Sequence, residues 1–189
     1  MLIPLRLSAQ TDEQLMQRAA RGSDRAFEEL YNRYARRLQG FFVRRLGNDA
    51  DLAADFMHDT FLRLYAAREK YHEGSSFRAW LYTIAYNLCK NHLRNQLAIV
   101  SDCSAVDGLS VDDSNIEVEL DAAMLHKALR DVLRSLPEPY AMLFSLHYEE
   151  ELTIPQIAQI TDLPEGTVKS RLHKAMNIIK QNLKQYENR

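Results

Sequence analysis

Two adjoining stretches near the end of the chain decide the fold, Leu152-Thr153-Ile154-Pro155-Gln156-Ile157-Ala158 and Leu163-Pro164-Glu165-Gly166-Thr167-Val168-Lys169-Ser170-Arg171-Leu172. They predict two short helices joined by a tight turn, with Thr153 and Gln156 at capping-box spacing before the first helix. The second helix is expected from about Glu165 to Leu183, with an inward stripe of Val168, Leu172, Ala175, Met176, Ile179 and Leu183. This pattern is typical of a helix-turn-helix, which presents its second helix to the major groove of DNA.

The outward side of that second helix is polar and basic. In such a helix Arg and Lys can pair with guanine, while Ser and Thr can hydrogen-bond to phosphates. The alternative is a structural helical bundle with a solvated basic face. The capped short helix, the Leu-Pro-Glu-Gly turn and the basic helix start occur together, which favours DNA binding. The candidate DNA-binding residues are Thr167, Lys169, Ser170, Arg171, His173 and Lys174.

An unusual aromatic helix is expected upstream, from Ser75 or Ser76 to about Leu97. Four of its residues, Phe77, Trp80, Ile84 and Leu88, are predicted to share a core stripe. The remaining aromatic residues alternate with Lys, Arg and Asn, a mixture that suits single-stranded DNA because rings stack on bases and cations follow phosphates. An ordinary amphipathic helix explains the residues about as well.

The helix before it carries Asp55 and Asp59 four residues apart, so two like charges share one face at some cost. Acidic residues beside the apolar Phe56 and Leu62 indicate a contact with protein rather than DNA. A plain solvated face is nearly as good an interpretation.

The helical spacing of the apolar residues and the positions of helix-breaking residues predict an all-α chain of two small helical domains. The first domain, residues 1–97, also holds helices over Asp12–Ala20 with Thr11 or Asp12 as cap, from Asp24 to a stop at Gly47, and over Ala50–Arg68. Residues 98–115 carry no sustained period and predict a flexible acidic linker. The second domain, residues 116–189, is expected to begin with helices over Ile116–Ser135 and Pro139–Tyr148.

The net charge of −2 conceals basic segments. Residues 1–95 hold 15 Lys and Arg against 11 Asp and Glu, and residues 165–189 hold 6 against 2, whereas residues 96–121 hold 7 acidic residues and no basic one. No apolar run is long enough to span a membrane, and neither a secretory signal nor a disulfide framework is indicated, so we expect a cytoplasmic protein without membrane insertion.

Catalytic and metal-binding patterns are weak. Cys89 and His92 lie three residues apart, but no second ligand pair accompanies them, so Cys89 is expected to be a small core residue. No phosphate loop or nucleophile motif is present. The sequence therefore predicts no cofactor, no metal and no enzyme activity.

With these motifs in view, nearly the whole chain resembles an extracytoplasmic-function sigma factor of the sigma-70 family. The stretches that carry the resemblance to the family's region two are Arg18–Ser23, Ala26–Tyr31, Asp55–Leu64 and Phe77–Arg94, and those that resemble region four are Leu136–Glu138 and Glu165–Leu172. Their order and spacing, with the acidic linker between them, make the match specific.

The resemblance implies a function in promoter recognition. The first domain would bind the clamp helices of bacterial core RNA polymerase through Asp55, Phe56, His58, Asp59 and Leu62. It would also melt and read the minus-ten element through Trp80, Thr83, Tyr86, Asn87, Lys90, Asn91 and Arg94. The second domain would bind the polymerase flap and would place the candidate residues of the last helix in the minus-thirty-five element. The family's usual control implies an anti-sigma partner.

Three residues depart from the family pattern. His58 stands where Gln is usual, Phe56 where Leu is usual, and Tyr86 where Arg is common. His58 adds a group that titrates near neutral pH to the expected polymerase-binding face.

Two other classes remain open. One is a conventional regulator, with a helix-turn-helix domain behind a sensor or dimerisation domain, which would bind an operator without polymerase. The other is a protein-interaction module, in which charge reversal of Lys169 and Arg171 would be harmless.

Overall fold

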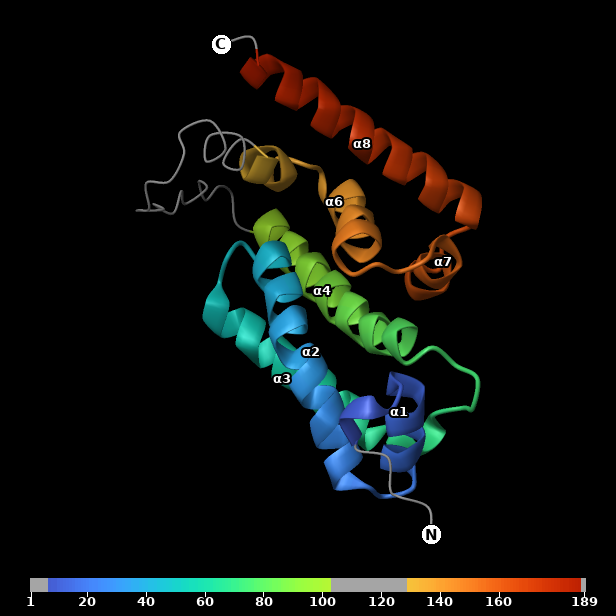
Figure 1. The fold of residues 1–189 in the computed structure, drawn as a ribbon. Helices are drawn as coiled ribbons and strands as arrows, with labels where there is room; N and C mark the ends of the chain where they lie inside the picture. The colour runs from blue at the N-terminus through green and yellow to red at the C-terminus, as the bar shows by residue number, and fades with distance from the viewer. Residues whose placement is uncertain (1–6, 103–128, 188–189) are drawn as a thin grey trace, which may run out of the picture. The chain divides into compact units, whose positions relative to one another are not determined.

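The computed structural model describes residues 7–102 and 129–187, and every regular element within these ranges is helical (Figure 1). The described chain separates into two compact units. One contains the residues up to Leu93 with Pro155–Leu163, and the other contains Arg94–Ile154 with the residues from Pro164 onward. The all-α fold class expected from the sequence is confirmed.

The first unit contains α1 (Asp12–Ala20), α2 (Asp24–Arg45), α3 (Ala50–Ala66) and the part of α4 (Phe77–Asp102) up to Leu93, together with α7 (Ile154–Thr161) from its second residue. The short 3-10 turns η1 (Leu7–Ala9) and η2 (Arg68–Lys70) precede α1 and follow α3. The expected cap of α1 is confirmed, because Thr11 Oγ1 accepts a hydrogen bond from the Gln14 amide and Gln14 Oε1 accepts one from the Thr11 amide. The expected stop at Gly47 is also confirmed, with a φ of 67° that glycine adopts without strain.

The core of the first unit lies where α1, α2, α3 and α4 pack together. Its largest fully buried side chains are Leu15, Met16, Leu30, Leu38, Phe41, Phe42, Leu64, Phe77, Leu81 and Tyr82. The ring of Phe41 contacts the rings of Phe42 and Tyr82 edge to face, with centroids 5.5 and 5.6 Å apart.

The core stripe predicted for the aromatic helix was partly wrong. Phe77 and Leu88 are buried as expected, but Trp80 and Ile84 are only half-buried. The buried stripe of α4 instead runs through Phe77, Leu81, Tyr82, Ala85, Leu88 and Cys89. Tyr82, rather than Trp80, packs against Phe41 on α2. Cys89 is fully buried, so its expected place in the core is confirmed.

Helix α4 extends to Asp102, beyond the predicted end at Leu97. Residues 103–115 of the predicted linker lie outside the described residues. The same holds for residues 116–128, the first part of the helix predicted over Ile116–Ser135. Residues 129–134, which are described, are helical as expected.

The second unit contains α6 (Glu138–Phe144), η3 (Ser145–Glu149) and α8 (Glu165–Glu187). The single helix predicted over Pro139–Tyr148 changes to a π-helical turn at Ser145, whose buried hydroxyl donates a hydrogen bond to the Glu149 carboxylate. The core joins Val132, Leu136, Ala141 and Ile179, with Met176 and Leu183 packed against them. The inward stripe predicted for the last helix is therefore confirmed, since Val168, Leu172 and Ala175 are buried too.

The helix before the turn is α7 (Ile154–Thr161), and α8 begins at Glu165 as the sequence predicted. Asp162 in the turn has a φ of 57°, a left-handed conformation that Asp tolerates better than most residues. Among the described residues, none of the helices combines the length and apolar character needed to span a membrane.

Candidate functional site: three faces of two helical units

The outer face of α3 combines acidic residues, a histidine and an exposed leucine. Asp55, His58 and Leu62 are exposed and Asp59 is half-buried, and their spacing of three, four and seven residues places them on one side of the helix. Leu62 is 69% exposed, which is unusual for so large an apolar side chain in this unit. The structure therefore brings together four of the five residues expected to contact polymerase.

The fifth of those residues, Phe56, lies differently. Its ring contacts Phe42 and His92 edge to face, with centroids 5.5 and 5.4 Å apart, and it is half-buried. Phe56 therefore supports the α3 face from inside the unit. His58 Nε2 lies 3.4 Å from the hydroxyl of Tyr31 on α2, a contact that limits how the imidazole can turn.

Charge on the α3 face is partly balanced locally. Arg63 Nε donates to Asp59 Oδ1 at 2.9 Å, one turn along the helix, and this pairing raises the pKa of Arg63. Both side chains are about half exposed, so the pair contributes little to stability. Asp55 is exposed, and its negative charge lies on the same side of α3 as Leu62.

All seven residues predicted for the minus-ten surface lie along one side of α4, because their numbers follow helical spacing. Asn87, Lys90, Asn91 and Arg94 are exposed, and Trp80, Thr83 and Tyr86 are half-buried. The Lys90 ammonium lies 6.0 Å from the centroid of the Tyr86 ring. This face therefore presents stacking surfaces at its start and cations further along.

Sequence reasoning missed a loop that joins this face. A hollow at the start of α4 is lined by Ala79, Trp80 and Thr83, by Gln159 of α7 and, from the loop before α4, by Lys70, Tyr71, His72, Gly74, Ser75 and Ser76. The Tyr71 ring is stacked on Trp80, with centroids 5.5 Å apart and 29° between the planes. The Tyr71 hydroxyl donates to the Ser75 carbonyl, and Gly74 has a φ of 86° that lets the loop turn back. Tyr71 and Gly74, shortly before the aromatic helix, were the features of the sequence that could have indicated this loop.

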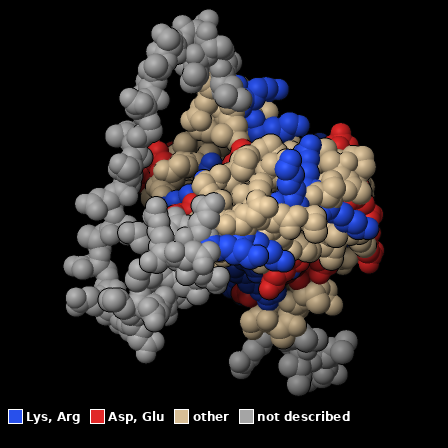
Figure 2. Space-filling model, turned by 90° about the horizontal axis from the view of Figure 1, so that it is seen from above, with Lys and Arg blue, Asp and Glu red and all other residues tan. Residues whose placement is uncertain are grey.

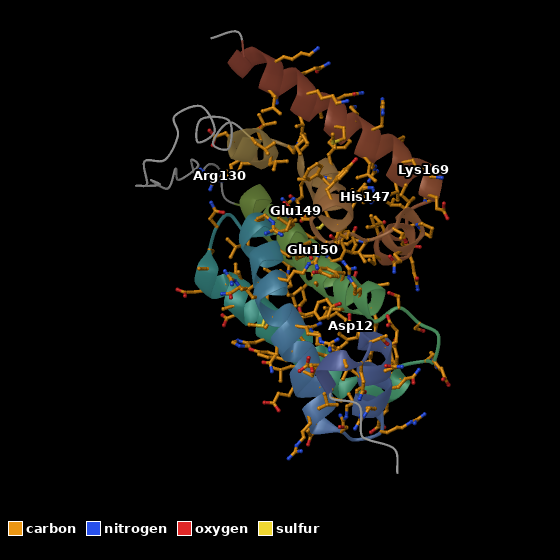
Figure 3. The ribbon with its side chains drawn as sticks, in the orientation of Figure 1. Asp12, Arg130, His147, Glu149, Glu150 and Lys169 are labelled. Atoms are coloured by element: carbon orange, nitrogen blue, oxygen red, sulfur yellow. The ribbon has the colours of Figure 1, made fainter. Side chains whose placement is uncertain are left out.

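The start of α8 displays the residues predicted for the minus-thirty-five surface. Lys169, Ser170, His173 and Lys174 are exposed, whereas Thr167 and Arg171 are half-buried. Figure 3 labels Lys169 near the beginning of this helix. Figure 2 shows several patches of Lys and Arg on the face it presents.

Several of these α8 side chains already have partners within the second unit. Lys169 Nζ lies 3.8 Å from Glu165 Oε2, and the Lys174 ammonium lies 5.5 Å from the centroid of the Tyr140 ring on α6. Ser170 Oγ donates to the Thr167 carbonyl at 3.0 Å. Glu165 and Tyr140 were not predicted as members of this surface, and only the four-residue spacing of Glu165 and Lys169 could have indicated the first.

No group of three or more His, Cys, Asp or Glu side chains is placed to hold a metal ion within the described ranges. The three faces offer surfaces for ring stacking, for contact with phosphates and for contact with protein. These features define a two-unit helical protein of the DNA-binding class.

Comparison with known proteins identifies the family. A family model for Sigma-70 region 2 matches residues 30–98, and one for Sigma-70, region 4 matches residues 126–178. The RNA polymerase sigma-H factor of Pseudomonas aeruginosa is 32% identical over 182 residues, covering 92% of this chain and 94% of that protein. The ECF RNA polymerase sigma-E factor of Escherichia coli K12 is 31% identical over 178 residues, covering 89% of this chain and 92% of that protein. The chain belongs to the extracytoplasmic-function group of the sigma-70 family and is an RNA polymerase sigma factor.

Solved structures agree with this fold. CnrH in complex with the cytosolic domain of CnrY is similar with a TM-score of 0.66 and 22% identity, over 92% of this chain and 97% of that one. The sigma factor RpoE in complex with the anti-sigma factor NepR from Bartonella quintana is similar with a TM-score of 0.68 and 22% identity, over 84% of this chain and 96% of that one.

Proposed function

We propose that this sigma factor binds bacterial core RNA polymerase and directs initiation at promoters with minus-ten and minus-thirty-five elements that it reads itself. The observation that carries the proposal is the single face of α4, where Trp80 and Tyr86, which begin beside the hollow, are followed by Lys90 and Arg94. Rings and cations in this order suit a DNA strand whose bases are unpaired. The polymerase supplies the chemistry of RNA synthesis.

The α3 face is the proposed polymerase contact. Leu62 would enter an apolar site on the clamp helices, with Asp55 and Asp59 meeting basic residues around it. An exposed apolar side chain ringed by charge is a common pattern for the centre of a protein interface. We expect Leu62→Asp to weaken binding to core polymerase about tenfold, because it places a charge where the contact would be dry. Fluorescence anisotropy of the labelled chain with core polymerase measures this, and unchanged affinity would remove α3 from the interface.

The hollow and the α4 face are the proposed minus-ten site. Melting exposes bases on the non-template strand, and one flipped base would enter the hollow against the Tyr71–Trp80 stack. Asn87 and Asn91 would hydrogen-bond base edges or the backbone, and Lys90 and Arg94 would follow the phosphates.

The α8 face is the proposed minus-thirty-five site. Lys169, Arg171 and Lys174 would contact guanine or phosphate in the major groove, with Ser170, Thr167 and His173 alongside. We further propose an anti-sigma partner, because the solved relatives CnrH and RpoE are each in complex with CnrY and NepR, respectively.

Run-off transcription tests the proposal. The template is the DNA upstream of the protein's own coding sequence, and the reaction contains core polymerase with and without the purified chain. A discrete transcript that requires the chain supports the proposal, and mapping its start locates both promoter elements. If the chain binds DNA without core polymerase and adds no transcript, a conventional regulator explains the molecule instead.

A further inference from the structure

Helix α1 reaches the start of α4 through one carboxylate. The backbone amide of Phe77, the first residue of α4, donates to Glu13 Oε1 at 3.4 Å, across 64 residues of sequence. The first amides of a helix have no partner within the helix, so a side chain that accepts from one of them caps the helix. Ser76 Oγ accepts from the Ala79 amide at 3.3 Å, so the cap of α4 is shared between a local and a distant residue.

Glu13 is held in place by the residue beside it. Asp12, labelled in Figure 3, accepts from Arg33 Nη1 at 2.9 Å and from the Tyr34 hydroxyl, both on α2. Arg33 also donates to the carbonyls of Leu7, Ser8 and Gln10 and to the Glu29 carboxylate. The first turn of α1 is therefore fixed to α2 before Glu13 reaches α4.

A closed chain of contacts links the three helices. The ring of Tyr34 packs against Phe77 with centroids 5.3 Å apart, while its hydroxyl donates to Asp12. Phe77 in turn donates its amide to Glu13. The direction in which α4 leaves the loop is thus set from α1 and α2 together.

The same two acidic residues act on the hollow. Burial, and then the charges of Glu13 and Asp12, raise the pKa of Tyr71 to about 12. Tyr71 is stacked on Trp80, and Trp80 is on the first turn of α4 that Glu13 caps. Moving the start of α4 would therefore change the stack that walls the hollow.

We propose that Glu13 is a positioning residue for the minus-ten site: by capping α4 at Phe77 it holds the hollow open for one unpaired base of a DNA strand. Glu13 is not among the residues that line the hollow, so its effect is exerted through Tyr71, Phe77 and Trp80. This inference rests on the proposed minus-ten function.

The test uses the holoenzyme, made from the full chain and core polymerase, and single-stranded oligonucleotides carrying the mapped minus-ten sequence. Each position of that sequence is replaced in turn by the other three bases, and affinities are measured by fluorescence anisotropy. We expect Glu13→Ala to weaken binding about fivefold, the size typical of a lost helix cap, and to flatten the base preference at one position. Glu13→Gln keeps the accepting oxygen and stays within about twofold of the wild type.

Three comparisons separate positioning from plain stability. Glu13→Asp keeps the charge but shortens the reach, so it should behave like Glu13→Ala, and it replaces that variant if Ala prevents folding. Glu28→Ala removes an exposed carboxylate from α2 and should leave affinity and base preference unchanged. Affinity for core polymerase and for a minus-thirty-five duplex should not change in any of these variants.

Each result decides a different point. If the wild-type holoenzyme does not bind the minus-ten oligonucleotide, the proposed function itself is wrong. If it binds and Glu13→Ala and Glu13→Asp lower only the melting temperature, with the same base preference, Glu13 is structural and the inference is overturned. Equal losses in Glu13→Gln and Glu13→Ala would also overturn it, since the accepting oxygen would then not be the cause.

Discussion

The two faces proposed to meet DNA are held by different means. On α8, the partners of Lys169 and Ser170 lie within four residues along the same helix, whereas Lys174 contacts the Tyr140 ring on α6. At the start of α4, the hollow depends on α1, on α2, on the loop before α4 and on Gln159 of α7. A surface of the first kind keeps mobile side chains that can adjust to a groove, whereas one of the second kind has its shape before the ligand arrives.

The largest effect should come from reversing charge on α8. We expect the double variant Lys169→Glu, Arg171→Glu to bind a minus-thirty-five duplex about 100-fold more weakly, since each lost contact costs on the order of 1–3 kcal/mol. The slope of the logarithm of the binding constant against the logarithm of the salt concentration should become shallower by about 2, because two cations that contact phosphates are lost. Filter binding of the holoenzyme over a range of salt concentrations measures both. The control, Lys180→Glu with Lys184→Glu, changes the same charge further along α8 and should have a small effect. A harmless double reversal would favour the protein-interaction module.

The next effect tests whether the α4 face depends on a stacked ring. Trp80→Ala removes the partner of Tyr71, and stacking of one base on an aromatic ring contributes about 1–3 kcal/mol. We expect about 30-fold weaker binding of the minus-ten strand. Trp80→Phe should keep most of the affinity because a ring remains. A 2-aminopurine in the minus-ten strand reports unstacking, and an unchanged signal in Trp80→Ala would contradict base capture at this point.

The difference between the two faces also explains what the sequence could predict. Val168, Leu172 and Ala175 follow a helical period, so the inward stripe of α8 and its outward basic face could be derived from local spacing alone. The period of α4 did not decide between two neighbouring stripes, because Trp80 and Tyr82 are both aromatic. The choice was made by packing against Phe41 on α2, which local spacing does not contain.

Residues that act through long-range contacts were even harder to predict from the sequence. Glu13 is one of two adjacent acidic residues in the first turn of α1, where acidic residues are favoured in any helix. Its contact with Phe77 exists only after α1, α2 and α4 have packed. Tyr71 likewise stacks on Trp80, nine residues later, and this contact forms only when the loop turns at Gly74.

A smaller effect tests how closely DNA approaches α8. Gly166 lies in the first turn of α8, and a Cβ added there would meet no protein atom within 4 Å. Gly166→Ala should therefore stabilise the second unit by up to about 1 kcal/mol through helix propensity. If the DNA backbone lies against this turn, affinity for the minus-thirty-five duplex should fall about threefold at the same time. Circular dichroism melting and filter binding measure the two quantities.

Gly40→Ala provides the comparison, because it changes helix propensity within α2. Its added Cβ would lie 3.2 Å from Arg44 Nη1, the end of a flexible side chain, so the neighbour can move. This variant should leave binding of the minus-thirty-five duplex unchanged. If Gly166→Ala gains stability without any loss of binding, the DNA does not approach the first turn of α8 closely.

The smallest effect tests whether the hollow exists before DNA arrives. The pKa of Tyr71, raised to about 12 from an ordinary value near 10, means that the folded unit favours the neutral phenol. Its contribution to the free energy of unfolding is therefore complete below about pH 10 and is lost as the pH rises towards 12.

In the free protein, ultraviolet titration should show one phenol fewer in the late-titrating fraction of Tyr71→Phe. Stability should also fall less steeply between pH 10 and 12 in that variant. Glu13→Gln should shift the late titration to lower pH, because one of the charges that raise the Tyr71 pKa is gone. If Tyr71→Phe leaves the titration curve unchanged in shape above pH 11, Tyr71 is not buried against Trp80 in the free protein, and the hollow would then form only on binding, as adaptable as the surface of α8.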